Sequence, residues 1–263
     1  MLLKQFNLTS KIPSFEDKGF IILKNIIKKK IIKNIISEIE IITNDQIKKN
    51  NLNSGNKNFK NLIKFAFKDK KSDIRFFLYH RLRSLPSVQN LCFSDEFTKI
   101  LKSLGQKVPA CVQKPTIRFD FAEENIHKLK AHQDIRAILC SKCITIWIPI
   151  TSVNKINGTI RVYKKSHKEG LLNHSFDKNN QCVIKNMKLL DKYNYEDINA
   201  DAGDIIIMNS FCAHSSVKGK KNSMKINIQS FYNDLSQINM NDEYYTLKNI
   251  PDAGKRTMHG EYK

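Results

Sequence analysis

The chain has 263 residues, of which 41% are hydrophobic and 27% are charged, and this composition indicates one large folded domain and excludes a disordered chain. No segment approaches the roughly 18 to 20 uninterrupted apolar residues that span a bilayer, and the N-terminus lacks the apolar core of a signal peptide. We therefore expect a cytoplasmic protein without a transmembrane segment. The formal charge of +20 is carried mainly by lysines spread along the whole chain, so it does not by itself indicate a nucleic-acid partner.

The N-terminal part of the chain has the spacing of helices. From about residue 20 to residue 42 the apolar positions recur at helical intervals, and further helices are predicted at 76–83 and 88–104. The polar segment 44–60 predicts a mobile loop between them. We therefore predict a helical N-terminal flank over about 1–107.

The sequence pattern changes near Val108, where short β-branched and aromatic runs are bounded by turn residues. This pattern is typical of strands. Helices followed by many short strands predict a jelly roll or barrel rather than an alternating βαβ sheet. We predict a single domain with its β core at about 108–235 and a C-terminal tail at 236–263. The expected strands are 111–121, 137–139, 144–150, 159–163, 204–208 and 224–232.

The six cysteines show no spacing typical of a disulfide framework. Cys140 and Cys143 form a C-x-x-C pair, but a structural zinc site would need a second pair of ligands with similar spacing. We therefore expect buried, reduced thiols at these two positions.

His132 and Asp134 are the first candidates for metal ligands, because residues i and i+2 of an extended segment project to the same side. A third ligand must come from another strand, and His214 follows the apolar run 205–208 at a suitable place. Two histidines and one carboxylate leave three positions of an octahedral ion open, which is typical of non-haem Fe(II) oxygenases. His132, Asp134 and His214 are thus the predicted metal-binding and catalytic residues.

Several blocks around these residues occur in an order that resembles a known family. They are the opening segment 15–23, the A-H-Q-D of 131–134, the W-I-P-I of 147–150, the N-G-T-I-R-V of 157–162, the S-H-K of 166–168, and the A-G-D of 202–204 that leads to His214. The chain resembles the phytanoyl-CoA dioxygenase-like (PhyH) family of Fe(II)- and 2-oxoglutarate-dependent oxygenases. The resemblance implies a double-stranded β-helix (jelly roll, cupin-like) with N-terminal helices. It also implies that Fe(II), 2-oxoglutarate and O2 take part, with release of succinate and CO2.

Lys225 stands where the family usually has an arginine, eleven residues after the distal histidine. In the family this arginine binds the far carboxylate of 2-oxoglutarate, and we predict the same role for Lys225. A lysine offers a point charge and not the planar, two-pronged fit of an arginine, which leaves the affinity for the cosubstrate and even its identity open. Lys225, Asn227 and Gln229 share one face of a predicted strand, so Gln229 is also predicted to lie at the cosubstrate site.

Two further residues are predicted to contact the cosubstrate. Lys114 and Arg118 have same-face spacing on the strand before His132, where relatives often use a basic or amide side chain, and Lys114 is the predicted contact. Trp147, the only tryptophan, is predicted to form a wall of the cosubstrate site, with a purely core role as the alternative.

These features predict a dioxygenase that hydroxylates a small metabolite, which the basic charge suggests is anionic. A different class remains open, namely a cupin-like protein that binds a metal without turnover or uses another cosubstrate, and Lys225 is its main support. A nucleic-acid-modifying oxygenase rests on net charge alone. The sequence does not identify the substrate or the oligomeric state.

Overall fold

The computed structural model describes residues 2–68, 73–123, 129–178, 181–239 and 241. Within these ranges, six α-helices lie in the N-terminal part: α1 Ile12–Lys18, α2 Lys29–Lys49, α3 Phe59–Lys68, α4 Ile74–Arg81, α5 Pro86–Cys92 and α6 Asp95–Ser103. Most strands follow them: β1 Phe20–Leu23, β2 Pro109–Cys111, β3 Thr116–Phe121, β4 Cys143–Pro149, β5 Thr159–Tyr163, β6 His174–Phe176, β7 Cys182–Ile184, β8 Tyr195–Asp197, β9 Ile205–Asn209, β10 His214–Val217 and β11 Met224–Asp234.

The described strands pair antiparallel in three sheets. The largest has the order β1-β9-β4-β11-β2, and β3 also pairs with β11. A second sheet has the order β10-β5-β8, and β6 and β7 form a third. β11 is the longest strand and pairs with β2, β3 and β4, so its register fixes which side chains of three other strands face one another.

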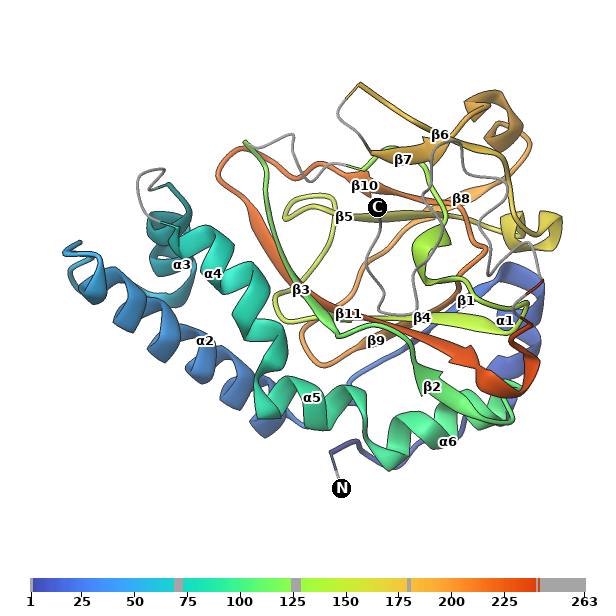
Figure 1. Cartoon of the computed structure of the whole chain (residues 1–263), viewed down its shortest axis with the longest axis horizontal. Helices are drawn as coiled ribbons and strands as arrows, with labels where there is room; N and C mark the ends of the chain where they lie inside the picture. Colours follow the sequence, from blue (N-terminus) through green and yellow to red (C-terminus); the bar gives the residue numbers. More distant parts are fainter. Residues whose placement is uncertain (1, 69–72, 124–128, 179–180, 240, 242–263) are drawn as a thin grey trace.

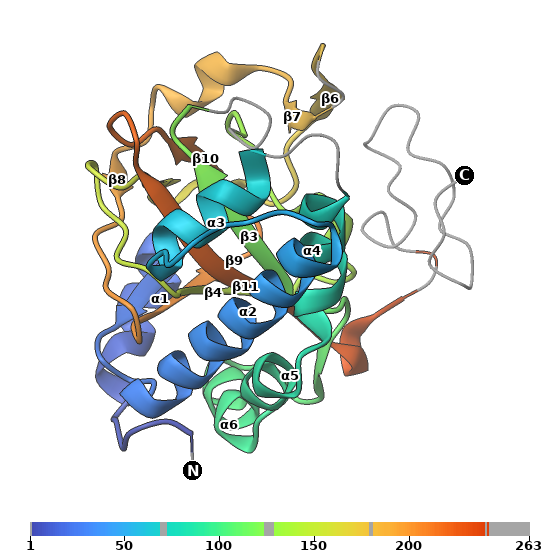
Figure 2. The ribbon, with the colours of Figure 1, turned by 90° about the vertical axis from the view of Figure 1, so that its left-hand side faces the viewer.

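Helices cover one face of the large sheet (Figures 1 and 2). The longest helix, α2, begins at Lys29, and its buried residues recur every three or four positions, which places them on one stripe. This stripe joins the outward-facing residues of the sheet in the main core, while the lysines of α2 lie mostly on its exposed side. The buried residues of α2 are Ile32, Ile35, Ile39, Thr43 and Ile47.

The opposite face of the large sheet packs against the three-stranded sheet. Trp147 of β4 and Met208 of β9 share a second core with Ile160 and Val162 of β5. Two antiparallel sheets packed face to face around such a core form the predicted jelly roll, and polar residues replace this apolar packing at one side of the interior. The candidate functional residues lie on that side.

The segment 20–23 is a strand and not part of the predicted helix. β1 pairs with β9, with Phe20 opposite Met208 and Leu23 opposite Ile205. A short continuous apolar run does not distinguish a strand from a buried helix by periodicity, and Gly19, with a φ of 86°, ends α1 just before it. Long-range pairing decided the structure of this segment.

Two of the predicted strands are also wrong in detail. The expected strand 111–121 is divided into β2 and β3, and Pro115, which has no N–H to donate to a ladder, lies in the gap between them. The expected strand 137–139 is absent, since Ile135–Ala137 is a 3-10 helix. The amide group of Asn233 accepts from Leu139 N–H (2.9 Å) and donates to the Ala137 carbonyl (2.7 Å), so a side chain replaces the expected ladder. The predicted strands 144–150, 159–163, 204–208 and 224–232 are confirmed to within two residues as β4, β5, β9 and β11.

The polar segment predicted as a loop is shorter than expected. α2 continues to Lys49 because the buried stripe extends through Thr43 to Ile47. The predicted tail 236–263 lies mostly outside the described residues. Among the helices of the described residues, none is both long and apolar enough to cross a membrane.

Candidate active site

An isolated β-bridge brings the first and last predicted metal ligands together. His132 and His214 exchange both backbone hydrogen bonds, each at 2.9 Å, although 82 positions of sequence separate them. His214 is also the first residue of β10 and pairs with Val162 of β5. The bridge therefore ties the H-x-D segment to the edge of the smaller sheet.

The three predicted ligands converge on one point. Nε2 of His132 lies 4.0 Å from Oδ1 of Asp134, and Nε2 of His214 lies 3.8 Å from Oδ2 of the same carboxylate. One ligand atom from each residue lies within 4.8 Å of the other two. These separations suit three donors on one face of an octahedral ion with metal–ligand bonds of about 2 to 2.2 Å.

Hydrogen bonds set the tautomer of both imidazoles. Nδ1 of His132 lies 2.8 Å from the Lys130 carbonyl, and Nδ1 of His214 lies 3.0 Å from the Cys212 carbonyl. A carbonyl only accepts, so each Nδ1 carries a proton and each Nε2 presents a lone pair to the shared point. Burial, with the nearby charge of a second imidazole, lowers the pKa of His132 well below its usual range, which keeps this ring neutral as a metal ligand must be.

The carboxylate of Asp134 has partners from two strands. Thr145 of β4 donates its hydroxyl to Oδ2 at 2.9 Å and lies 3.0 Å from the hydroxyl of Ser210. The amide Nε2 of Gln229 lies at the long distance of 3.5 Å from both carboxylate oxygens. These groups orient Asp134 toward the histidines, as outer hydrogen bonds do at metal centres.

Gln133 points away from the three ligands, as its place between His132 and Asp134 requires, and its side chain anchors the segment 132–134. Its Nε2 donates to the carbonyls of Gly170 (2.8 Å) and Phe211 (2.7 Å), and its Oε1 accepts from Leu172 N–H (2.8 Å). Its backbone N–H donates to Nε2 of His174 at 3.2 Å. Gln133 thus fixes the chain on both sides of it, and with it the positions of His132 and Asp134.

A cavity of about 390 Å³ opens in front of the candidate ligands. Its volume lies within the range of small-molecule sites. His132 and Asp134 are among the residues that line it. Its other walls come from Gln113, Thr116, Leu129, Gln133, Ile135, Arg136, Ala137, Gln181, Cys182 and Phe231.

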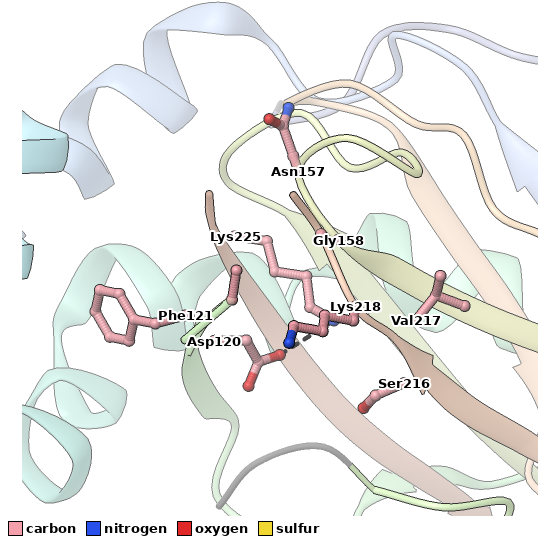
Figure 3. Close-up of a pocket in the computed structure, with 10 residues that line it drawn as sticks. Asp120, Phe121, Asn157, Gly158, Ser216, Val217, Lys218 and Lys225 are labelled. Atoms are coloured by element: carbon pink, nitrogen blue, oxygen red, sulfur yellow. Dashed lines mark ion pairs between the residues drawn. The ribbon is translucent and has the colours of Figure 1, made fainter. Parts of the chain in front are cut away.

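Lys225 lies inside the jelly roll, but its ammonium group is already paired with a carboxylate. Its Nζ lies 3.1 Å from Oδ2 of Asp120 (Figure 3). It also donates to the Thr159 carbonyl at 3.1 Å. Only 5% of the side chain is exposed. Burial lowers the pKa of Lys225, the charge of Asp120 opposes this effect, and the charge of Arg118 adds to it.

The other predicted cosubstrate contacts lie in different surroundings. Trp147 is buried on β4, and Nζ of Lys225 lies 5.9 Å from the centre of its ring, so the indole does form a wall beside that ammonium group. Gln229 lies beside Asp134, at the metal-ligand end. Lys114 is exposed and lies outside the strands, between β2 and β3. The role predicted for each of these residues stays a prediction.

Several residues of this site were not singled out in the sequence. Thr145 and Asp120, which contact Asp134 and Lys225, are the main ones. Asn227, already named for its place between Lys225 and Gln229 on one face of β11, is fully buried, and neither atom of its amide group has a hydrogen-bond partner in the described part of the chain. A signal was available in β3, where Arg118 and Asp120 alternate with residues of the main core, which predicts charged groups on the inner face.

Comparison with known proteins places these features in a family. A family model described as Phytanoyl-CoA dioxygenase (PhyH) matches residues 15–223. A methylphosphonate hydroxylase of Gimesia maris is 27% identical over 132 residues, which are 50% of this chain and 49% of that protein. The chain therefore matches about half the length of this curated relative.

Solved structures show the same fold at low sequence identity. The epimerase SnoN in complex with Fe3+, alpha ketoglutarate and nogalamycin RO has a TM-score of 0.60 at 11% identity, over 94% of this chain and 91% of that chain. EctD from S. alaskensis, with 2-oxoglutarate and 5-hydroxyectoine, has a TM-score of 0.59 at 11% identity, over 87% and 77%. HygX from Streptomyces hygroscopicus, with nickel and 2-oxoglutarate bound, has a TM-score of 0.57 at 9% identity, over 88% of both chains. The predicted fold class is confirmed.

Proposed function

The chain belongs to the phytanoyl-CoA dioxygenase family, and we propose that it is an Fe(II)- and 2-oxoglutarate-dependent dioxygenase that hydroxylates a small metabolite with release of succinate and CO2. The observation that carries the proposal is the convergence of His132, Asp134 and His214 on one point, where His132 and Asp134 also line a cavity. When bound there, iron and 2-oxoglutarate supply the oxidising power that an unactivated C–H bond requires.

The residues of the chain fit this metal and cosubstrate. Two imidazoles and one oriented carboxylate would hold the ion on one face and leave the other face open to the cavity. The buried amide of Asn227, which has no partner within the described residues, offers both a donor and an acceptor to a polar cosubstrate inside the jelly roll. Asp134 itself favours hydroxylation over halogenation, because its carboxylate fills the coordination position that a halide would need.

The walls of the cavity support a small, anionic substrate. Arg136 is exposed at the wall, and Gln113 and Gln181 add polar groups beside the apolar ring of Phe231. An arginine suits carboxylates and phosphonates through paired hydrogen bonds. The name of the Gimesia relative, a methylphosphonate hydroxylase, agrees with a small anion without defining which one this chain takes.

An anaerobic titration tests the cofactor assignment. Addition of 2-oxoglutarate to the Fe(II)-loaded protein should produce the weak visible charge-transfer band of a metal-chelated 2-oxo acid, and His214→Ala should abolish it. The matched control is His80→Ala, because His80 is exposed on α4 and has the same side chain. A wild-type protein that binds iron but gives no band would refute the proposed cofactor pair and favour the cupin-like binding protein.

A screen of substrate pairs tests the charge of the substrate. Each anionic candidate is assayed with a neutral analogue of the same shape, with succinate release as the readout. Arg136→Gln should lower kcat/KM for the anion by about tenfold and leave the neutral analogue unchanged, while Arg81→Gln, on the exposed face of α4, should change neither. Turnover of neutral or cationic compounds alone would refute an anionic substrate. The cytoplasmic location and the lack of a nucleic-acid partner stay predictions.

A further inference from the structure

The inner face of β3 and β11 carries a row of polar residues that leads away from the candidate metal ligands. On β11 the row is Gln229, Asn227 and Lys225, and the residues opposite them on β3 are Thr116, Arg118 and Asp120. Gln229 contacts Asp134, so the Asn227–Arg118 pair lies one same-face step, about 7 Å, farther into the jelly roll. The Lys225–Asp120 pair lies two steps away.

The Lys225 end of this row is already satisfied by groups of the chain. The Lys225 ammonium has both a carboxylate and a carbonyl within 3.1 Å. The pocket beside this ion pair measures only about 20 Å³, which is room for about one water molecule (Figure 3). This pocket is too small to admit a second carboxylate to Lys225 from that side.

Arg118 lies closer to the candidate metal ligands along this row. Its guanidinium is 3.4 Å from Oδ1 of Asp120. Its side chain is 21% exposed. Asn227, directly opposite Arg118 on β11, is buried, and both atoms of its amide group lack a partner among the described residues.

The charges of this cluster match one dicarboxylate. Arg118 and Lys225 carry two positive charges, and Asp120 carries one negative charge, so the cluster has a net charge of +1. One far carboxylate balances it. A five-carbon diacid spans roughly 5 Å between its end carbons, since each C–C bond adds about 1.3 Å to an extended chain. This length is compatible with a far carboxylate at the first step of the row.

We infer that Arg118, with the Asn227 amide beside it, is the principal contact for the far carboxylate of 2-oxoglutarate. Lys225, held by Asp120, is then a positioning residue and not the contact. The inference rests on the proposed function and reassigns one of its contacts. The chain has Lys225 where the family usually has an arginine. Arg118, on the neighbouring strand β3, supplies a planar guanidinium group in its place. This group can grip a carboxylate through two parallel hydrogen bonds, which one ammonium group cannot do.

A pair of ligands isolates the far carboxylate in the test. 2-Oxopentanoate has the five-carbon chain and the 2-oxo acid group of 2-oxoglutarate but ends in a methyl group. Calorimetry with the Fe(II)-loaded, oxygen-free protein gives a dissociation constant for each acid. The ratio of the two constants measures what the far carboxylate contributes to binding, and the visible band shows that each acid reaches the metal.

Three variants decide which cation makes this contribution. Arg118→Gln should reduce the preference for 2-oxoglutarate by about ten- to a hundredfold and leave the binding of 2-oxopentanoate unchanged, and Arg118→Lys should lie between Arg118→Gln and the wild type. The control is the double variant Asp120→Leu with Lys225→Met, which removes the ion pair as a unit and keeps the net charge of the cluster at +1. It should retain most of the preference. Thermal melting shows whether each variant is folded.

The outcomes separate this inference from the function on which it rests. If Arg118→Gln keeps the preference and the double variant loses it, Lys225 is the contact and the inference is wrong. Equal losses in both would also overturn Arg118 as the principal contact. If the wild-type protein binds iron and neither acid, the proposed function itself fails.

Discussion

The two ends of the polar interior are assembled in different ways. At the metal-ligand end, His132 and Asp134 are two positions apart, and one β-bridge adds His214. At the far end, the Lys225–Asp120 pair exists only because β3 and β11 pair in one particular register. The first end depends on local spacing and one bridge, and the second depends on a ladder between strands separated by about a hundred residues.

This difference explains why a motif locates the metal ligands more surely than the cosubstrate contacts. Same-face spacing within an H-x-D segment follows from the geometry of extended backbone. The partner of Lys225 follows from strand register, and a slip by one residue would turn Asp120 outward. The role of Lys225 at the family's arginine position therefore depends on its partner on the neighbouring strand, Asp120, which the motif does not indicate.

The largest expected effect comes from removing a ligand at the metal-ligand end. His214→Ala should lower the affinity for Fe(II) by more than the roughly 10- to 100-fold that follows loss of a supporting hydrogen bond, because an open donor position replaces a direct bond. Equilibrium titration with Fe(II) under argon measures this, with His80→Ala as the control. Unchanged affinity in His214→Ala would mean that the three residues do not form the metal centre.

A smaller loss is expected from a hydrogen bond that orients a ligand. Thr145→Val keeps the shape of the side chain and removes the donor to Asp134, so the affinity for Fe(II) should fall by about 10- to 100-fold. Thr43→Val is the matched control, because Thr43 is equally buried and its hydroxyl bonds the Ile39 carbonyl inside α2, away from the candidate ligands. Equal metal affinity in both variants would show that Thr145 only packs.

Much of the fold could be predicted from the sequence, and the errors have identifiable causes. Short β-branched and aromatic runs bounded by turn residues predicted β4, β5, β9 and β11. The strand Phe20–Leu23 was mistaken for helix because both of its faces are mostly buried and the run has no period. Segment 137–139 was mistaken for a strand because Asn233, almost a hundred residues later, supplies its hydrogen bonds.

The candidate site divides in the same way. His132, Asp134 and His214 were predicted and the structure brings them together, whereas Asp120 was not predicted because a carboxylate opposite a lysine is a property of register. Lys114 was chosen over Arg118 from the same spacing argument. Pro115 interrupts the strand between them, which leaves Lys114 exposed in the gap and Arg118 inside.

Asn227 offers a test in which stability and binding should change in opposite directions. Asn227→Leu replaces two buried, unpartnered polar atoms by apolar ones of similar volume, so the free energy of unfolding should rise by about 2 kcal/mol. The same change removes the amide beside Arg118, so the preference for 2-oxoglutarate over 2-oxopentanoate should fall. Chemical denaturation and calorimetry measure the two effects. A variant that is destabilised, with its ligand preference intact, would show that Asn227 has a structural role alone.

The smallest effect should come from the opposite end of β11, where Asp234 holds the segment that precedes β2. Its carboxylate accepts from the N–H groups of Lys107 (2.8 Å) and Val108 (2.9 Å) and from Ser236. Burial alone would raise the pKa of Asp234, but these hydrogen bonds outweigh it and lower the pKa from 3.8 to about 2.

A carboxylate with a lowered pKa in the folded state stabilises the protein above its unfolded pKa, and this contribution is lost as pH falls through the folded pKa. Asp234→Asn should therefore lower the free energy of unfolding by about 1 kcal/mol at pH 7, since the amide keeps one acceptor oxygen, and the difference from wild type should shrink below about pH 4. Urea denaturation at several pH values measures it, and Asp45→Asn, in an exposed pair with Lys49, is the control. The ligand preference should not change in Asp234→Asn. A changed ligand preference would mean that the hydrogen bonds of Asp234 at one end of β11 influence the strand register at its other end. The two ends of the polar interior could then not be treated as separately assembled.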